Sequence, residues 1–191
     1  MITIARLREE LRLPADRDGD LASIIAETVG LWEAETRRLW AWREDHTQVI
    51  LPFTDRLSTI WLELGPVAEV TQVQESQGYP GETATTLDAT IYTQYGSRGL
   101  RRLDGAWAPG VRVTYSGGYA AETAAGPPVI PATPPEIARA FLIQARFRLA
   151  RTGDANIAIQ SQNFEGGSGV YLDPYMHPAF AGLAKRLARK V

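Results

Sequence analysis

The alternation of apolar and polar residues divides this chain into helical ends and a β-rich middle. Near the start, apolar residues such as Leu21, Ile24 and Trp32 recur every three or four positions. This spacing is typical of an amphipathic helix that buries one face. Asp20 precedes the apolar stripe, and its carboxylate is well suited to cap the first free N–H groups of a helix. We therefore expect a long helix at about 20–40.

From about residue 47 the period changes to two, which predicts strands. In STIWLEL, for example, Ile60, Leu62 and Leu64 face one way and Trp61 faces the other. Asp104-Gly105 is a hairpin signal between two such runs. Because the connections are short, the strands are predicted to be antiparallel, in a β-rich insert at about 47–116. The expected strands are QVILPF, STIWLEL, VAEVTQVQ, ATIYTQY, LRRL and VRVTY.

The helical period returns after a proline-rich stretch. Thr133, followed three residues later by Glu136, forms a capping-box pattern, and Pro134 suits the first helical position. A second long helix is expected at about 134–151 and a C-terminal helix at about 179–190. The predicted fold class is α+β, a helical core with an antiparallel β-rich insert.

The segment between the last two helices has no period and many small or polar residues. An aperiodic stretch of this length is often ordered by a partner. The predicted domains are therefore a core at 1–153, which holds the β insert at about 45–118, and an extended tail at 154–191.

Composition narrows the class of protein. The 191 residues include no cysteine, which excludes disulfides and thiolate metal sites. No stretch approaches the roughly 18 apolar residues of a membrane span, so no membrane partner is expected. The net charge of −2 conceals an asymmetry, because residues 1–135 carry −6 and residues 136–191 carry +4. A basic tail on an acidic body is suited to nucleic acid, an acidic protein partner or another copy of the chain.

The sequence offers little catalytic chemistry. His46 and His177 are the only histidines, and neither has a metal-binding partner four residues later in the sequence. No nucleophile motif is present, and the glycine-rich run at 166–169 lacks the lysine of a phosphate loop. The acidic residues at 16–20 fit helix capping better than a calcium loop. We predict a protein that is not an enzyme and needs no cofactor.

Nucleic-acid binding is the alternative from another class. Arg98, Arg101 and Arg102 cluster in the sequence near aromatic residues, which could form a cationic and aromatic surface. The same pattern also fits a hairpin with its arginines in solvent and its aromatics packed beneath. The aromatic residues concerned are Tyr92, Tyr95 and Trp107.

One run carries a family resemblance. VRVTYSGGY at 111–119 places valines, tyrosines and glycine as VxVxYxxGY, and a proline bridge leads from it into the helix PPEIARAFLIQARFRLAR. An acidic helix start at Asp16 to Asp20 and the strand LGPVAEVTQV come before it. In this order the elements resemble the head–tail connector (adaptor, or head completion) proteins of tailed bacteriophages and phage-derived gene-transfer particles. The signature residues are Val111, Val113, Tyr115, Gly118 and Tyr119.

The resemblance implies a structural role at the head–tail junction of a virion, with assembly in the host cytoplasm. Such proteins form an oligomeric ring, usually of twelve copies, below the portal. The ring extends the DNA channel without sequence-specific binding and offers a platform for stopper or tail proteins. A stopper or tail-terminator ring protein of the same junction remains an alternative within this class.

The tail residues are the candidates for contact with a partner. In this hypothesis the tail docks on the portal, with apolar side chains as anchors and basic side chains facing an acidic portal surface. The predicted portal and partner interface consists of Phe164, Tyr171, Tyr175, Phe180, Leu183, Lys185, Arg186, Leu187, Arg189 and Lys190.

Overall fold

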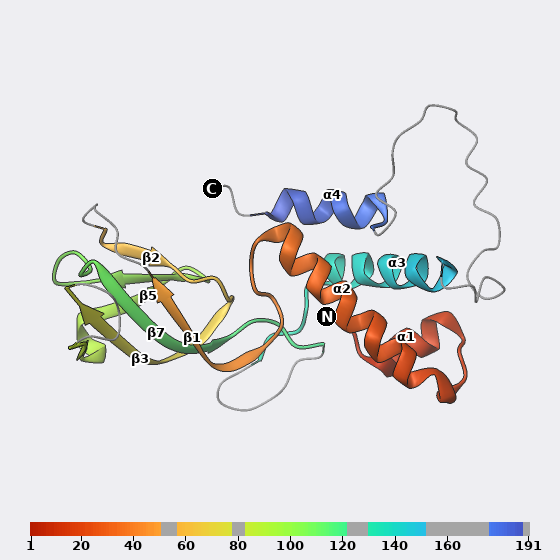
Figure 1. Cartoon of the computed structure of the whole chain (residues 1–191), viewed down its shortest axis with the longest axis horizontal. Helices are drawn as coiled ribbons and strands as arrows, with labels where there is room; N and C mark the ends of the chain where they lie inside the picture. Colours follow the sequence, from red (N-terminus) through yellow and green to blue (C-terminus); the bar gives the residue numbers. More distant parts are fainter. Residues whose placement is uncertain (51–56, 78–82, 122–129, 152–175, 189–191) are drawn as a thin grey trace. The chain divides into compact units, whose positions relative to one another are not determined.

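The computed structural model describes residues 1–50, 57–77, 83–121, 130–151 and 176–188, and it divides the chain into two compact units (Figure 1). The helical unit comprises residues 1–38, 120–122 and 132–191, and the β unit comprises residues 39–119 and 123–131. Helices in one unit and antiparallel sheets in the other confirm the α+β class.

The helical unit is organised around its second helix. Helix α2 contacts α1, α3 and α4. Their bounds are α1 Ile4–Leu11, α2 Asp18–Thr36, α3 Pro135–Arg151 and α4 Pro178–Leu187, with a 3-10 turn η1 at Ala15–Arg17. The three predicted helices are present, but α2 ends four residues early. Arg37 terminates it in the left-handed region at φ 53°, where its N–H bonds back to Ala34 and Glu33.

Both predicted helix caps are wrong. Helix α2 begins at Asp18, so Asp20 lies inside its first turn and forms an ion pair with Arg17 at 2.8 Å. There it still complements the positive end of the helix dipole. Helix α3 begins at Pro135, so Pro134 and not Thr133 stands at the capping position, and the Thr133 hydroxyl donates to the carbonyl of Ala120 at 2.8 Å.

The β unit contains two antiparallel sheets (Figure 1). The first has the order β1-β7-β3-β4 and the second has the order β2-β6-β5. Strand bounds are β1 Arg43–Ile50, β2 Thr59–Trp61, β3 Val67–Ser76, β4 Thr85–Thr86, β5 Tyr92–Tyr95, β6 Gly99–Arg102 and β7 Gly110–Gly117, with a 3-10 turn η2 at Ala89–Ile91.

The two sheets share one apolar core. The alternation in STIWLEL is confirmed, because Ile60, Leu62 and Leu64 are buried whereas Trp61 is 52% exposed. Val111, Val113 and Tyr115 of β7 meet these side chains from the first sheet. Since the inner faces of both sheets line this core, each sheet turns its outer face away from it.

The hairpin predicted at Asp104-Gly105 is wrong. Strand β6 pairs with β2 and β5, whereas β7 pairs with β1 and β3, so the chain crosses between sheets at that point. The hairpin in this region instead joins β5 to β6 through Gly96, whose φ of 61° suits glycine.

Candidate partner interface

Helix α4, which supplies half of the predicted interface residues, packs into the helical unit through an aromatic cluster. Phe180 is fully buried, and its ring lies 5.2 Å from the centroid of Trp32 and 5.9 Å from that of Phe141. Trp32 and Phe141 are themselves in edge contact at 5.4 Å. Edge-on and tilted arrangements are the favourable ones for aromatic pairs. The apolar side of α4 is therefore occupied by its own chain.

Two polar groups fix where α4 begins. Gln144 of α3 is fully buried, and its side-chain oxygen accepts the backbone N–H of His177 at 2.7 Å. The His177 ring nitrogen Nδ1 in turn accepts the N–H of Ala179 at 3.2 Å, which caps the helix. Partial burial lowers the pKa of His177, so the neutral ring that can accept this bond is favoured.

The structure separates the predicted interface residues into three groups. Phe180 belongs to the core, and Leu183 and Leu187 are half-buried. Lys185 and Arg186 are exposed on α4 and present its positive charge to solvent. The remaining predicted residues, Phe164, Tyr171, Tyr175, Arg189 and Lys190, lie outside the described residues.

The arginines of the alternative nucleic-acid surface are largely engaged within the β unit. Arg98 donates to the carbonyl of Glu63. Arg102 pairs with Asp104 and with Glu75, and the hydrogen bonds that its guanidinium donates to these two carboxylates, Asp104 first, raise its pKa. The β unit holds nine acidic and six basic residues, a net charge of −3. This charge opposes phosphate binding.

The aromatics of the same region are split between two faces. Trp107 is buried and packs against Tyr92 at 6.4 Å, as the packed-hairpin interpretation expects. Tyr95 is 49% exposed and contacts Trp61 at 6.2 Å, with the guanidinium of Arg101 5.9 Å from its ring. Tyr95 and Arg101 thus remain available to a partner.

The VRVTYSGGY run forms the closing end of the β unit. The Tyr115 hydroxyl accepts the N–H of Leu64 at 3.1 Å and donates to the side-chain oxygen of Gln48 at 3.0 Å. Burial raises the pKa of Tyr115 to about 12, so the hydroxyl stays protonated. Gly118 has φ 96°, and a Cβ there would lie 2.6 Å from the carbonyl oxygen of Ala41. The run is therefore built for close backbone packing.

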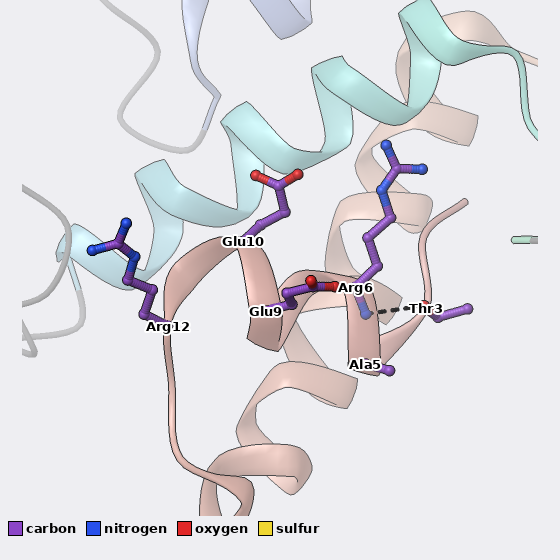
Figure 2. Close-up of a pocket in the computed structure, with 6 residues that line it drawn as sticks. All are labelled: Thr3, Ala5, Arg6, Glu9, Glu10 and Arg12. Carbon is purple, nitrogen blue, oxygen red and sulfur yellow. Dashed lines mark hydrogen bonds between the residues drawn. The ribbon is translucent and has the colours of Figure 1, made fainter.

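The described residues offer little in the way of a small-molecule site. An open hollow of about 610 Å³ lies along α1 (Figure 2) and is lined by Thr3, Ala5, Arg6, Glu9, Glu10 and Arg12. Its two arginines and two glutamates balance in charge, and Glu10 also pairs with Arg146 at 3.4 Å. Among the described residues no group of three His, Cys, Asp or Glu side chains is placed to hold a metal. No helix in the described part of the chain is both long and apolar enough to cross a membrane.

The sequence matches no protein-family model and no curated protein. Two solved structures are similar to it over nearly their whole length. One is a chain in the neck of an empty gene transfer agent (GTA) particle, computed with C6 symmetry, with a TM-score of 0.58 and 19% identity over 100% of this chain and 91% of that chain. The other is a chain in the neck of a native GTA particle, computed with C12 symmetry, with a TM-score of 0.53 and 15% identity over 98% of this chain and 89% of that chain. The resemblance in the sequence is thus supported by the fold, which this chain shares with proteins of the GTA neck.

Proposed function

We propose that this chain is a structural head–tail connector subunit, which forms a ring below the portal of a tailed phage or a phage-like particle. The observation that carries the proposal is the match of the whole chain, helical and β units together, to chains of GTA necks. Those necks were computed with C6 and C12 symmetry, which supports a cyclic assembly of identical copies. Twelve copies are proposed here, with no catalytic activity and no cofactor.

The ring would extend the DNA channel and serve as a platform for stopper or tail proteins. A conduit for DNA does not need to grip its cargo, because strong phosphate contacts would oppose passage. The net charge of −3 on the β unit fits such a role. The proposed location is the head–tail junction of the particle, after assembly in the host cytoplasm.

The proposed portal contact lies in the C-terminal tail. Lys185 and Arg186 already present positive charge on the exposed side of α4. Because Phe180 is occupied within its own chain, the apolar anchors of this proposal are Phe164 and two tyrosines of the same segment, Tyr171 and Tyr175. Arg189 and Lys190 extend the basic end.

Electron microscopy of the purified chain, alone and mixed with the portal protein of its particle, tests the proposal. Twelve-fold rings seated directly on portal are expected. A ring that joins portal only when another connector protein is already present would identify the alternative, a stopper or tail terminator. A chain that stays monomeric, ignores portal and binds duplex DNA would contradict the connector function.

A full-length variant separates portal contact from ring formation. Replacing Phe164, Tyr171 and Tyr175 with serine removes the proposed anchors while leaving α4 and its aromatic cluster intact. This variant should lose portal binding. A matched variant that exchanges each for another aromatic residue should retain it. Equal portal binding by the serine variant would rule out these anchors.

A further inference from the structure

Large exposed apolar side chains gather at the sheet β2-β6-β5. Of the five that the described residues expose, Trp61 and Tyr95 lie on the outer face of this sheet, and Leu57 and Leu103 lie in the chain just before β2 and just after β6. Their exposed fractions run from 39% to 59%. We call Trp61, Tyr95 and Arg101 the aromatic face.

Strand register explains how the aromatic face is assembled. Trp61 pairs with Gly99 on the central strand, and Gly99 pairs with Tyr95. Since Gly99 has no side chain, the aromatic rings of Trp61 and Tyr95 meet across it at 6.2 Å. A Cβ on Gly99 would lie 2.5 Å from the carbonyl oxygen of Tyr95 and 3.3 Å from the Trp61 ring. The next row of the same face places Arg101 between Thr59 and Thr93.

This composition is that of a protein-binding surface. Tyrosine, tryptophan and arginine are the residues that most often dominate the energy of protein interfaces. A group of exposed apolar side chains on one face of a sheet is also typical of a surface that binds another molecule. Arg101 stacks on Tyr95 at 5.9 Å and so offers one charge in the middle of an apolar surface. A partner for this face needs apolar area and negative charge.

The first sheet of the same β unit offers an exposed apolar side chain and negative charge on its outer face. On the outer face of the sheet β1-β7-β3, Val49 is 43% exposed. Asp45 and Glu69 are exposed where β1 and β3 flank Ser116, and the Asp45 carboxylate also accepts the Thr71 hydroxyl at 3.2 Å. The half-buried Arg112 is the direct cross-strand partner of Val49, so this face carries one positive charge beside the two negative ones. We call Asp45, Val49 and Glu69 the acidic face.

We infer that the aromatic face of one copy binds the acidic face of the next copy. The inference rests on the proposed ring, because a closed ring of identical subunits requires a head-to-tail interface between two different surfaces. The two faces meet this requirement, since they are different surfaces on the outer sides of two sheets that share one core. Arg101 then meets Asp45 and Glu69, and Trp61 meets Val49.

Ring assembly by surface variants tests this contact. Trp61→Ser with Tyr95→Ser should weaken each subunit contact by roughly 30-fold or more, as loss of an aromatic hot spot does. The matched control Trp61→Tyr with Tyr95→Phe keeps both aromatic rings and should assemble normally. Only Trp61 and Tyr95 are changed, and they are 52% and 49% exposed in the single copy, so both variants should stay folded and thermal unfolding checks this.

Charge-reversal variants test whether the molecule bound to the aromatic face is another copy of this chain. Arg101→Glu alone, and Asp45→Lys with Glu69→Lys, should each weaken assembly. Combining the three substitutions in one chain restores an opposite-charge pair at every contact and should recover rings. Rescue of this kind is specific to contact between copies of the chain.

The outcomes separate this inference from the proposed function. Normal rings formed by the Trp61→Ser, Tyr95→Ser variant contradict the inference and leave the connector function standing. Normal rings that fail to bind another neck protein or DNA assign the aromatic face to that partner and also overturn the inference. A wild-type chain that forms no ring, with or without portal, contradicts both.

Discussion

The aromatic cluster under α4 leads to a definite prediction about Phe180. Its replacement by alanine removes a fully buried side chain that contacts two aromatic rings at 5.2 Å and 5.9 Å. Buried Phe→Ala changes cost about 3–5 kcal/mol, and each aromatic pair accounts for about 0.5–1.5 kcal/mol beyond area burial. We therefore expect the free energy of unfolding to fall by about 3 kcal/mol or more if α4 stays docked.

A second outcome of the same change follows from the length of α4. Helices shorter than about 12 residues are marginal in water, and α4 has 10 residues. Without Phe180 the helix can instead separate from α2 and α3, which limits the global loss to the free energy of its docking. Hydrogen exchange would then report loss of protection across 178–187, with α3 still protected.

Urea unfolding and native-state hydrogen exchange measure these two outcomes together. Lys185→Ala is the matched control, because its exposed side chain should change stability by no more than about 0.5 kcal/mol. A Phe180→Ala chain within about 1 kcal/mol of wild type and with α4 amides equally protected would refute the assignment of α4 to the helical core.

Three further predictions concern single side chains. Tyr115→Phe leaves the buried N–H of Leu64 without its acceptor and should cost about 1–3 kcal/mol in urea unfolding. The pKa of His177 lies below its ordinary 6.5 in the folded chain, so the α4 cap is fully present above pH 6.5 and is lost as pH falls through the folded pKa. Hydrogen exchange of Ala179 should accelerate over that range. Gly30→Ala, with open space around the new Cβ in α2, should stabilise the helix by up to about 1 kcal/mol in thermal unfolding.

Each of these has a clear contrary result. An unchanged urea midpoint for Tyr115→Phe would mean that the hydroxyl does not satisfy the Leu64 N–H. His177→Asn keeps a capping oxygen but has no titratable ring. Hydrogen exchange of α4 in this variant, corrected for the intrinsic exchange rate, should therefore not depend on pH between 7 and 5. The same acceleration in this variant would mean that another group titrates. A destabilised Gly30→Ala chain would mean that this site is less open than the structure indicates.

Local patterns predicted local structure well. Period-two alternation identified Trp61 as the outward residue among Ile60, Leu62 and Leu64, because alternation along a strand reports directly which face each side chain occupies. The preference of proline for the first helical turn placed the start of α3 at Pro134, within one residue of its observed start. Strand partners were not predictable in this way. The Asp104-Gly105 pair has hairpin chemistry, but β6 finds its partners in β2 and β5 through long-range core packing.

The candidate partner interface also shows that the sequence predicted local structure but not long-range contacts. The apolar stripe of α4 was visible in the sequence, but an amphipathic pattern does not say whether the partner is the same chain or another. Phe180 proves to be covered by Trp32 and Phe141. Conversely, Tyr95 and Trp61 are far apart in the sequence and become neighbours only through the register that places Gly99 between them. The one sequence feature that pointed to the aromatic face was Trp61, which the alternation pattern placed on the outer side of its strand with no predicted element packed over it.

The entry and exit of the β unit carry one more consequence. Trp40 stacks on Tyr119 at 5.8 Å, and the N–H of Trp42 donates to the carbonyl of Tyr119 at 3.0 Å. The chain thus leaves the β unit beside the point where it entered. An inserted module with adjoining ends can gain, lose or exchange loops and strands without separating the residues that flank it. The surfaces of the β unit can then differ from one particle to another. Adapting to a different neighbouring protein in the neck requires substitutions in the β unit only, and the helical unit can stay as it is.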